Sequence, residues 1–552
     1  MSTPTQTLGA RSAVLDDAHV GDIKGAFGTI AHHDTAPRTH WFAKLRTLLA
    51  ILGPGLIVMV GDNDAGAFAT YTQAGQNYGT TLLWTLMLLI PVLFVNQEMV
   101  LRLGAVTGVG HARLIFERFG KFWGAFSVID LFILNALTIV TEFIGITFAV
   151  EFLGVSKLMG VGIAAVLTMA AVSTGSFRIF ERFAMVLVFA SLLLVPVLVM
   201  VHPPMGQVAR DFAIPNWPAH SKLSDVMLLV IGIVGTTVAP WQLFFQQSYV
   251  IDKRITPRFL QYEKVDLWIG IGLVMIGGVA MMAFAAQLFG GRPEFGNFTD
   301  VGGVLSGLGK YEGRLPAVLF AVALIDACII GAASVSLATA YAIGDVFSVR
   351  HSLHRKVSDA KGFYLIYFGI IAFAATLVLI PGSPLGLLTE AVQTLAGVLL
   401  PSATVFLLLL CNDKAVLGPW VNSQKLNIFT GAIIWVLVML SVILTAATVF
   451  PDISGATILA ILGGGSVFAV FGYGTTLILR KDKSSPVMKG ATVAALVERN
   501  ERRAGWRMPP IEELPAPNLT LSKRIWMGVL RGYLLIAVGL VVVKIVEMML
   551  AK

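Results

Sequence analysis

The sequence predicts an all-α protein that crosses a membrane many times. Hydrophobic residues make up 56% of the 552-residue chain and charged residues only 13%, and the mean hydropathy is +0.80. Apolar runs long enough to span a bilayer as helices recur along most of the chain. These runs are continuous, whereas the strands of a membrane β-barrel alternate apolar and polar residues, so we expect helical spans.

Thirteen apolar runs are candidate spans. They are residues 45–75, 80–101, 124–152, 157–174, 180–201, 224–249, 265–289, 315–346, 363–381, 387–411, 427–450, 455–479 and 524–549. Residues 43–450 are expected to form the transmembrane core, and 451–480 and 523–552 to supply further membrane helices.

Basic residues indicate the orientation of these spans. Lys and Arg gather in alternate loops, for example at Arg178 and Arg182 and at Lys253 and Arg254, whereas loops such as PGSPLG hold none. The positive-inside rule places the basic loops and the N-terminus in the cytoplasm, with the membrane expected to be a bacterial inner membrane. The net charge of +8 therefore reflects these loops and does not indicate a nucleic-acid partner.

Two polar segments lie outside the spans. Residues 1–42 are small and polar, and they predict a disordered cytoplasmic tail. Residues 481–522 form a polar cytoplasmic insert with Pro-rich stretches, which is typical of a linker or a short surface helix. Neither segment indicates an obligate protein partner.

Histidine is missing from the predicted membrane centre, and the two cysteines are too few for a Cys-rich metal site. Cys328 and Cys411 are the only cysteines, and the nine histidines all fall in tails, loops or span ends. We therefore expect no histidine ligand or proton relay at mid-membrane. No group of residues indicates an enzyme, and no resident cofactor is expected.

The first span is interrupted by the stretch GDNDAGAF, residues 61–68. Ionisable residues inside a span are costly and mark functional sites. The small residues after Asp62 and Asp64 favour local unwinding, which would expose backbone carbonyl groups as oxygen ligands. The two acids lie about 200° apart on an ideal helix, so both reach one ion only if the segment is unwound.

The sixth span is interrupted at Pro240, within GTTVAPWQLFFQQ. Proline has no N–H, so the carbonyl of Thr236 loses its helical partner. Five spans separate the two breaks, and the broken spans therefore run in opposite directions. Paired breaks of this kind are typical of a transporter built from inverted repeats with a site near the midplane.

Other buried acids are weaker candidates. Glu142 in the third span is compatible either with a supporting role at the site or with helix packing, whereas Asp130, Asp326 and Glu390 fit structural roles better. Glu98 and Arg102 are spaced i, i+4 and are expected to pair at one end of the second span.

Several stretches resemble the Nramp family of divalent metal transporters. GPGLIVMVGDNDAGAFATYTQAGQNYGTTLLW (53–84) looks like the first span of that family, and GIVGTTVAPWQLFFQQS (232–248) looks like its sixth. RLGAVTG (102–108), TEFIG (141–145) and the spacing from Gln393 to Pro401 match further pieces. The resemblance covers about residues 43–450. It implies a LeuT-type 5+5 inverted repeat, about 43–201 and 224–411, with two or three extra C-terminal helices.

The chain departs from the family motifs at several positions. Asp64 matches the DPGN aspartate, but Ala65 replaces the proline and Ala67 replaces the asparagine ligand. In the sixth span, Ala239 replaces the methionine ligand; Trp241 and Gln246 stand in place of the two histidines. Ile139 takes the place of a third-span aspartate linked to proton movement, whereas Glu142 is retained.

Together the breaks and the resemblance imply a site for a divalent cation. Its candidate ligands are Asp64, Asp62, Asn63, Ala67, Thr236, Ala239 and Gln393, surrounded by Glu142, Gln242 and Gln246. A thioether favours soft transition metals, whereas carboxylate, carbonyl and water oxygens suit Mg²⁺ and Mn²⁺. Mg²⁺ also keeps part of its hydration shell, which a roomier site accommodates. The pattern is similar to the Nramp-related magnesium transporter branch.

The hypothesis is a carrier for partly hydrated Mg²⁺, which also accepts Mn²⁺, without proton coupling. One alternative is an ordinary proton-coupled Mn²⁺/Fe²⁺ importer. A second is an organic-solute symporter on the same fold, which two site acids disfavour. A third is a non-transporting membrane receptor or scaffold, which would tolerate loss of Asp64.

Overall fold

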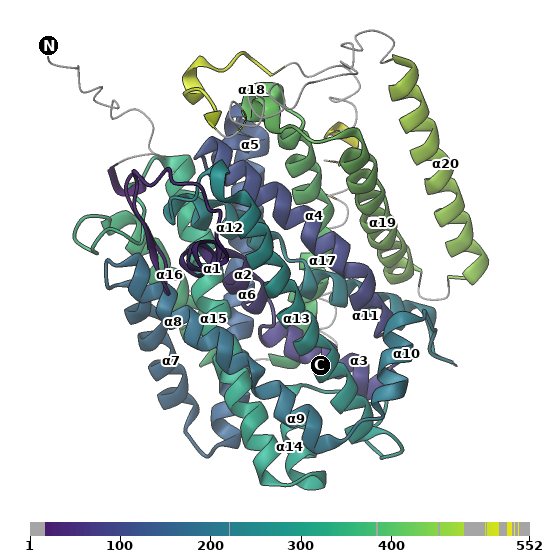
Figure 1. The fold of residues 1–552 in the computed structure, drawn as a ribbon. Helices are drawn as coiled ribbons and strands as arrows, with labels where there is room; N and C mark the ends of the chain where they lie inside the picture. Colours follow the sequence, from purple (N-terminus) through teal and green to yellow (C-terminus); the bar gives the residue numbers. More distant parts are fainter. Residues whose placement is uncertain are drawn as a thin grey trace, which may run out of the picture.

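Helices long enough to cross a bilayer make up most of the computed structural model (Figure 1). The structure describes residues 17–219, 221–381, 385–450, 453–479 and 505–517, together with position 503 and a few positions between 527 and 539. Within these residues, ten helices have the length and composition of membrane spans, and the bent pair α1–α2 makes up an eleventh.

Each predicted span up to residue 479 coincides with a helix or a broken helix. The unbroken spans are α4 (Trp84–Thr107), α6 (Lys121–Phe152), α7 (Lys157–Val172), α8 (Phe177–Ala190) continued by η2 (Ser191–Leu193) and α9 (Leu194–Val201), α13 (Leu260–Phe289), α15 (Arg314–Phe347), α16 (Lys361–Val378), α17 (Leu385–Cys411), α19 (Gln424–Val449) and α20 (Gly455–Leu479). The thirteenth predicted span, 524–549, lies almost entirely outside the described residues.

Short helices occupy the connections between spans. They are α5 (His111–Phe119), α10 (Met205–Ala213), η3 (Pro257–Phe259), α14 (Val301–Tyr311), α18 (Lys414–Leu417), η4 (Gly418–Trp420) and η5 (Ile511–Glu513). We call the end of the molecule that carries residues 17–36, α5 and α18 the N-terminal face, and the end that carries α10 and α14 the opposite face (Figure 1).

The first predicted break is present. α1 (Trp41–Ile51) bends by 50° into α2 (Pro54–Val60). The chain is then non-helical from Gly61 to Asp64, and α3 (Ala65–Tyr78) begins after it. The sharp bend between α1 and α2 is possible because Gly53 adopts φ 151°, a conformation that side chains with a Cβ rarely take.

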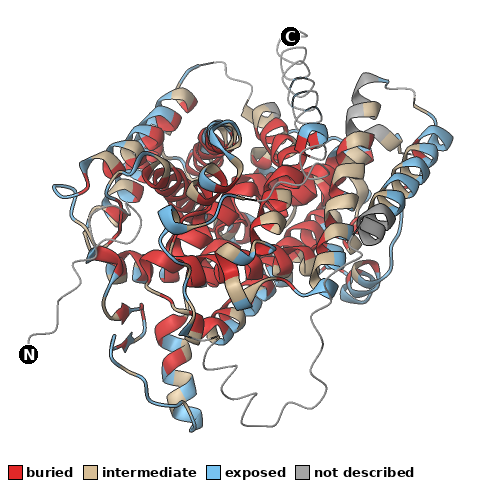
Figure 2. Ribbon diagram, turned by 90° about the horizontal axis from the view of Figure 1, so that it is seen from above, coloured by how far each residue is buried: buried red, intermediate tan, exposed pale blue. Residues whose placement is uncertain are grey.

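The second predicted break is present as well. α11 (Leu223–Thr237) ends at Val238, and α12 (Pro240–Asp252) begins after Ala239. In the most apolar stretch of the α11–α12 span, 89% of the residues are buried, whereas in that of α20 only 6% are. The broken spans therefore lie at the centre of the bundle and α20 at its edge (Figure 2).

The N-terminal segment differs from the disordered tail that its composition predicts. Residues 17–40 are described: η1 (Asp17–His19) precedes an antiparallel hairpin of β1 (Ile23–Lys24) and β2 (Thr29–Ile30). Arg254 and Arg178 donate hydrogen bonds to backbone carbonyl groups of this segment. Composition cannot reveal such order, because the core supplies the donors and the segment contributes mainly its backbone.

Part of the polar insert also packs on the N-terminal face. Arg118 donates to the carbonyl of Pro515 at 2.7 Å, and Trp420 donates to the carbonyl of Arg503 at 2.9 Å. The described portion, 505–517, is an extended surface segment with one short 3₁₀ turn, η5. Residues 481–502 lie outside the described residues.

Candidate cation-binding site

The two breaks meet in the middle of the bundle. The indole of Trp241 at the start of α12 and the hydroxyl of Ser334 on α15 lie against Gly61. Behind the break, the hydroxyls of Tyr71 on α3 and Thr237 on α11 share a hydrogen bond of 2.7 Å. The structure thus brings together the two segments that the sequence predicted to face each other.

Asp64 caps α3. Its Oδ1 accepts a hydrogen bond from the backbone N–H of Ala67 at 2.9 Å, an ordinary N-cap arrangement. Glu142 on α6 accepts from the N–H of Ala65 at 3.2 Å. Two carboxylates therefore share the N-terminal end of α3, where the helix dipole favours negative charge. Ala67 contributes its backbone N–H to this cap.

Asp62 is held differently. It is 1% exposed, and neither carboxylate oxygen has a hydrogen-bond partner within 3.5 Å. The carboxylate of Asp64 repels it electrostatically, and the amide of Gln242 is close enough to stabilise it, although the two make no hydrogen bond within 3.5 Å. A buried carboxylate with no partner is costly unless a cation or a proton joins it. Of the polar groups at the first break, Asp62 is therefore the one that most needs a cation or a proton.

Asn63 faces away from the second break. Its amide nitrogen donates to the carbonyl of Val274 at 3.3 Å and packs against Gly277, both on α13. Its Oδ1 has no partner. The structure therefore places the amide of Asn63 against α13. The carboxylate of Asp64 instead caps α3, and that of Asp62 lies near Gln242.

The second break offers oxygen atoms from Thr236. Its hydroxyl is buried without a partner. The next helical donor to its carbonyl would be residue 240, which is proline. The carbonyl of Ala239, by contrast, accepts from the N–H of Gln242 at 3.2 Å. Of the two carbonyls expected from the sequence, that of Thr236 is thus the freer one.

Glutamine side chains extend the site along α12. Gln97 on α4 donates to Gln242 Oε1 at 2.8 Å, and Gln242 Nε2 lies 3.5 Å from the carbonyl of Thr237. One turn further, Gln246 is fully buried and neither of its polar atoms has a partner. Gln97 was missed by the sequence reasoning, although its polar pair with Asn96 inside an apolar helix was a usable signal.

Gln393 approaches from α17. Its amide packs directly against Gly66, so closely that a side chain at residue 66 would collide with it. Its Nε2 is buried without a hydrogen-bond partner. α17 reaches this position because Gly235 and Gly397 let α11 and α17 pack backbone to backbone.

The prediction that Glu98 and Arg102 pair is confirmed, since their side chains lie 3.1 Å apart. Glu390 accepts a hydrogen bond from Gln73 at 2.7 Å, in agreement with a structural role.

Within the described part of the chain, no three His, Cys, Asp or Glu side chains form a cluster able to hold a metal ion. The oxygens that the breaks offer come from two carboxylates, amides, hydroxyls and the backbone.

A family model described as natural resistance-associated macrophage protein-like, or Nramp, matches residues 55–447. That is more than half of the chain, and it contains both breaks. The chain belongs to the Nramp family. It is accordingly an integral multi-pass membrane protein, and the resemblance stated from the motifs is confirmed at the level of the family.

Curated Nramp relatives match most of the chain. The divalent metal cation transporter MntH of Yersinia enterocolitica is 27% identical over 429 residues, which are 75% of this chain and 98% of that protein. MntH of Latilactobacillus sakei is 26% identical over 432 residues, which are 73% of this chain and 90% of that protein. These relatives are named as transporters and not as enzymes, in line with the expectation for this chain.

Solved structures of the Eremococcus coleocola manganese transporter share the fold. One of them aligns with a TM-score of 0.59 at 20% sequence identity and covers 80% of this chain and 95% of that one. A variant of the same transporter gives the same score. The predicted fold class, an all-α Nramp chain with the LeuT-type arrangement of spans, is therefore confirmed.

Proposed function

We propose that this Nramp chain carries partly hydrated Mg²⁺ across the membrane and also accepts Mn²⁺. Family membership makes it a divalent metal cation transporter. Asp62 supports the finer proposal most directly, because its buried carboxylate has no partner and stands beside a second acid, Asp64. A dication with its own water molecules would satisfy both groups.

The donor atoms support a hard metal. Residues 61–67 and 236–242 offer carboxylate, amide, hydroxyl and carbonyl oxygens, and they contain neither methionine nor histidine. Mg²⁺ and Mn²⁺ prefer such oxygen ligands, whereas thioether and imidazole favour later transition metals. In this proposal Asp64 and Asp62 bind the ion or its waters, and Ala67, Thr236, Ala239 and Gln393 line the site. Asn63, whose amide nitrogen is bonded to α13, contributes through water.

Transport without proton coupling is part of the proposal. Ile139, an apolar residue on α6, occupies the position where the family pattern has an aspartate linked to proton movement. Inward movement would then be driven by the membrane potential, which is worth about 4.6 kcal/mol for a dication at 100 mV. In this proposal the N-terminal face is cytoplasmic.

A second candidate is proton-coupled Mn²⁺ import. The named relatives are MntH proteins, and one structural neighbour is described as a manganese transporter. Within this chain, the retained Glu142 beside the cap of Asp64 would be the group that carries the proton.

Uptake into proteoliposomes with an internal pH dye separates the two candidates. We expect Mg²⁺ and Mn²⁺ to enter under an inside-negative potential without a change in internal pH. Acidification that accompanies Mn²⁺ entry would contradict uncoupled transport. Entry of Mn²⁺ with no measurable entry of Mg²⁺ would contradict the proposed substrate.

A further inference from the structure

A single buried lysine holds the bend between α1 and α2. Lys253, the residue after the last turn of α12, is 1% exposed. Its Nζ donates to the carbonyls of Ile51 at 2.5 Å and Leu52 at 2.8 Å, and to Glu181 Oε1 at 2.7 Å. An ammonium group has three donors, so all of them are used, two of them on the bend itself.

Asp266 holds the other side of the same bend. Its carboxylate accepts from the N–H of Gly53 at 3.1 Å and of Gly55 at 2.6 Å. These N–H groups lie at the start of α2, where no intrahelical acceptor exists for them. The end of α1 and the start of α2 are thus tied to charged side chains from two other parts of the bundle.

The helix between the bend and the site is short. α2 has seven residues; it meets α1 at 50° and gives way at Gly61 to the break that carries Asp62 and Asp64. A segment with non-helical connections at both ends can turn as a unit, because the residues at its ends absorb the change. Movement at the bend would therefore reach the carboxylates directly.

The N-terminal segment is bonded to the same ion pair. Ala26 donates its backbone N–H to Glu181 Oε2 at 2.5 Å, while Oε1 of the same carboxylate faces Lys253. Arg182, one residue further along α8, donates to the carbonyl of Ala26 at 3.1 Å. Residues 17–36, which we call the brace, thus contact the pair that holds the bend.

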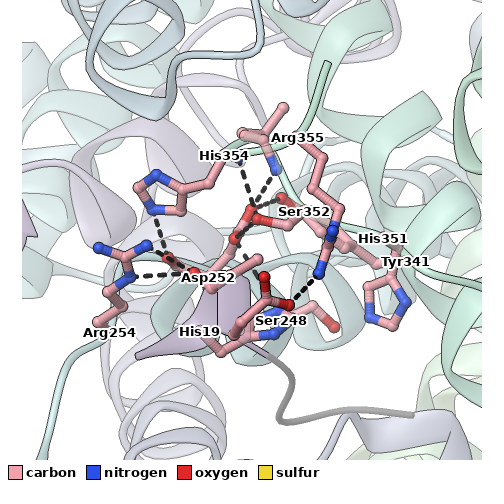
Figure 3. Close-up of polar contacts among 12 residues, drawn as sticks. His19, Ser248, Asp252, Arg254, Tyr341, His351, Ser352, His354 and Arg355 are labelled. Carbon is pink, nitrogen blue, oxygen red and sulfur yellow. Dashed lines mark hydrogen bonds and ion pairs between the residues drawn. The ribbon is translucent and has the colours of Figure 1, made fainter. Parts of the chain in front are cut away.

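The residues on either side of Lys253, which are Asp252 and Arg254, are both anchored by polar contacts (Figure 3). The carboxylate of Asp252 accepts from Tyr341 at 2.6 Å and from Ser352 at 2.5 Å, which ties the end of α12 to α15 and the loop after it. Arg254 donates to the carbonyl of Ala18 at 2.6 Å. Lys253 is therefore held between the core on one side and the brace on the other.

We propose that Lys253 and Glu181 form the gate of the ion path at the N-terminal face, and that the brace holds this gate shut. While the pair is intact, the bend is fixed and the site is closed to that face. When the pair separates, α2 turns and the site opens. This inference rests on the proposed transport of a divalent cation, but the gate can be tested without ion flux.

Ser334 provides a reporter for the opening. Its hydroxyl lies against Gly61, is fully buried and has no hydrogen-bond partner. In a background in which Cys328 and Cys411 are replaced by serine, we would introduce Ser334→Cys. The measurement is the rate of its alkylation by a membrane-impermeant maleimide added at the N-terminal face of reconstituted vesicles.

Lys253→Met removes both bonds to the bend, and we expect it to raise the alkylation rate about tenfold or more, as a population shift toward the open state. Ala26→Pro removes the N–H that reaches Glu181 and leaves Lys253 in place, so we expect a smaller rise of the alkylation rate. Lys44→Met, which changes an exposed lysine of α1, is the matched control and should leave the rate unchanged.

A further variant keeps the test valid if Lys253→Met is poorly folded. Removal of one partner leaves an unpaired buried charge, which is strongly destabilising, whereas Lys253→Met combined with Glu181→Gln removes both charges. Fast alkylation of the combined variant supports the gate. The same rate in wild type, Lys44→Met and the combined variant would overturn it. If the combined variant is alkylated fast but wild type moves no Mg²⁺, the gate stands and the transport proposal fails.

Discussion

Asp62 and Asp64 are neighbours in sequence but have different surroundings. One oxygen of Asp64 is committed to the N–H of Ala67, whereas neither oxygen of Asp62 is committed to any donor. Asp64 is therefore fixed in direction by the helix that it caps. No donor within 3.5 Å fixes the direction of Asp62, so in the proposed site it would bind the ion directly or through water, beside the fixed carboxylate of Asp64.

The absence of a thioether at Ala239 leads to a prediction on metal choice. We expect Ala239→Met to raise Mn²⁺ uptake relative to Mg²⁺ by about tenfold, because a sulfur ligand favours the softer ion. Competition between the two metals in the same vesicles measures the ratio. Leu243→Met, one turn along α12 and equally buried, is the control. An equal ratio in both variants would argue against a ligand position at residue 239.

His111 gives a prediction on pH. Burial lowers the pKa of His111 to about 4 in the folded protein, against an unperturbed value of about 6.5. The unfolded chain therefore binds the proton first as the pH falls, and folding at pH 5 loses about 2 kcal/mol through this group. We expect the unfolding temperature in detergent to fall between pH 7 and pH 5 more steeply in wild type than in His111→Asn. The same pH dependence of the unfolding temperature in both proteins would contradict a lowered pKa of His111.

The sequence identifies which residues are candidates for the site, but it does not show which way their side chains point. Asp62, Asp64 and Pro240 stand out because polar or helix-breaking residues are conspicuous in apolar runs. The amide of Asn63 turns toward α13, and that depends on a tertiary contact at Gly277 that no local pattern shows. Lys253 looked like an ordinary basic loop residue, since burial by segments distant in sequence cannot be read from its neighbours.

At the scale of elements, both broken spans could be predicted, and for a physical reason. Proline removes a helical donor, and a cluster of acids and small residues weakens a membrane helix, so each break has a local cause. The bend between α1 and α2 was missed, although Gly53 and Pro54 precede the break in sequence. Its angle depends on contacts with Lys253 and Asp266 from distant elements.

Pro240→Ala tests the second break. An alanine at this position restores an N–H for the carbonyl of Thr236, which favours a continuous helix and withdraws that oxygen from the site. We expect Mg²⁺ uptake to fall about tenfold or more, while the unfolding temperature does not fall. Pro257→Ala, at the start of η3, controls for loss of a proline elsewhere. Unchanged uptake in Pro240→Ala would show that the break is not needed.

At the scale of the whole molecule, the helices were predictable and the N-terminal segment was not. Apolar runs fix the number and approximate limits of the spans because lipid requires every backbone group to be paired within a helix. Residues 17–36 carry no such signal. Their order comes from arginines such as Arg178 and Arg254, which bind backbone carbonyls and leave no trace in composition.

The basic loops predict which face is cytoplasmic. A tag joined to the N-terminus should be reached by an impermeant reagent in inside-out vesicles and not in intact cells, because positive loops stay inside. A tag placed in the connection between α13 and α14, at residues 290–300, should behave in the opposite way. Labelling of the N-terminal tag in intact cells would reverse the orientation and, with it, the side on which the gate lies.

One measurement tests most directly whether the paired breaks bind the transported dication. Mg²⁺ uptake into proteoliposomes under an imposed inside-negative potential is compared between wild type and Asp64→Ala, with the exposed-residue variant Lys44→Met as the control for folding and reconstitution. We expect rapid uptake by wild type and by Lys44→Met, and loss of about a hundredfold in Asp64→Ala, because removal of an anionic ligand leaves the ion's charge uncompensated inside the membrane. Wild-type uptake in Asp64→Ala would contradict the assignment of the site.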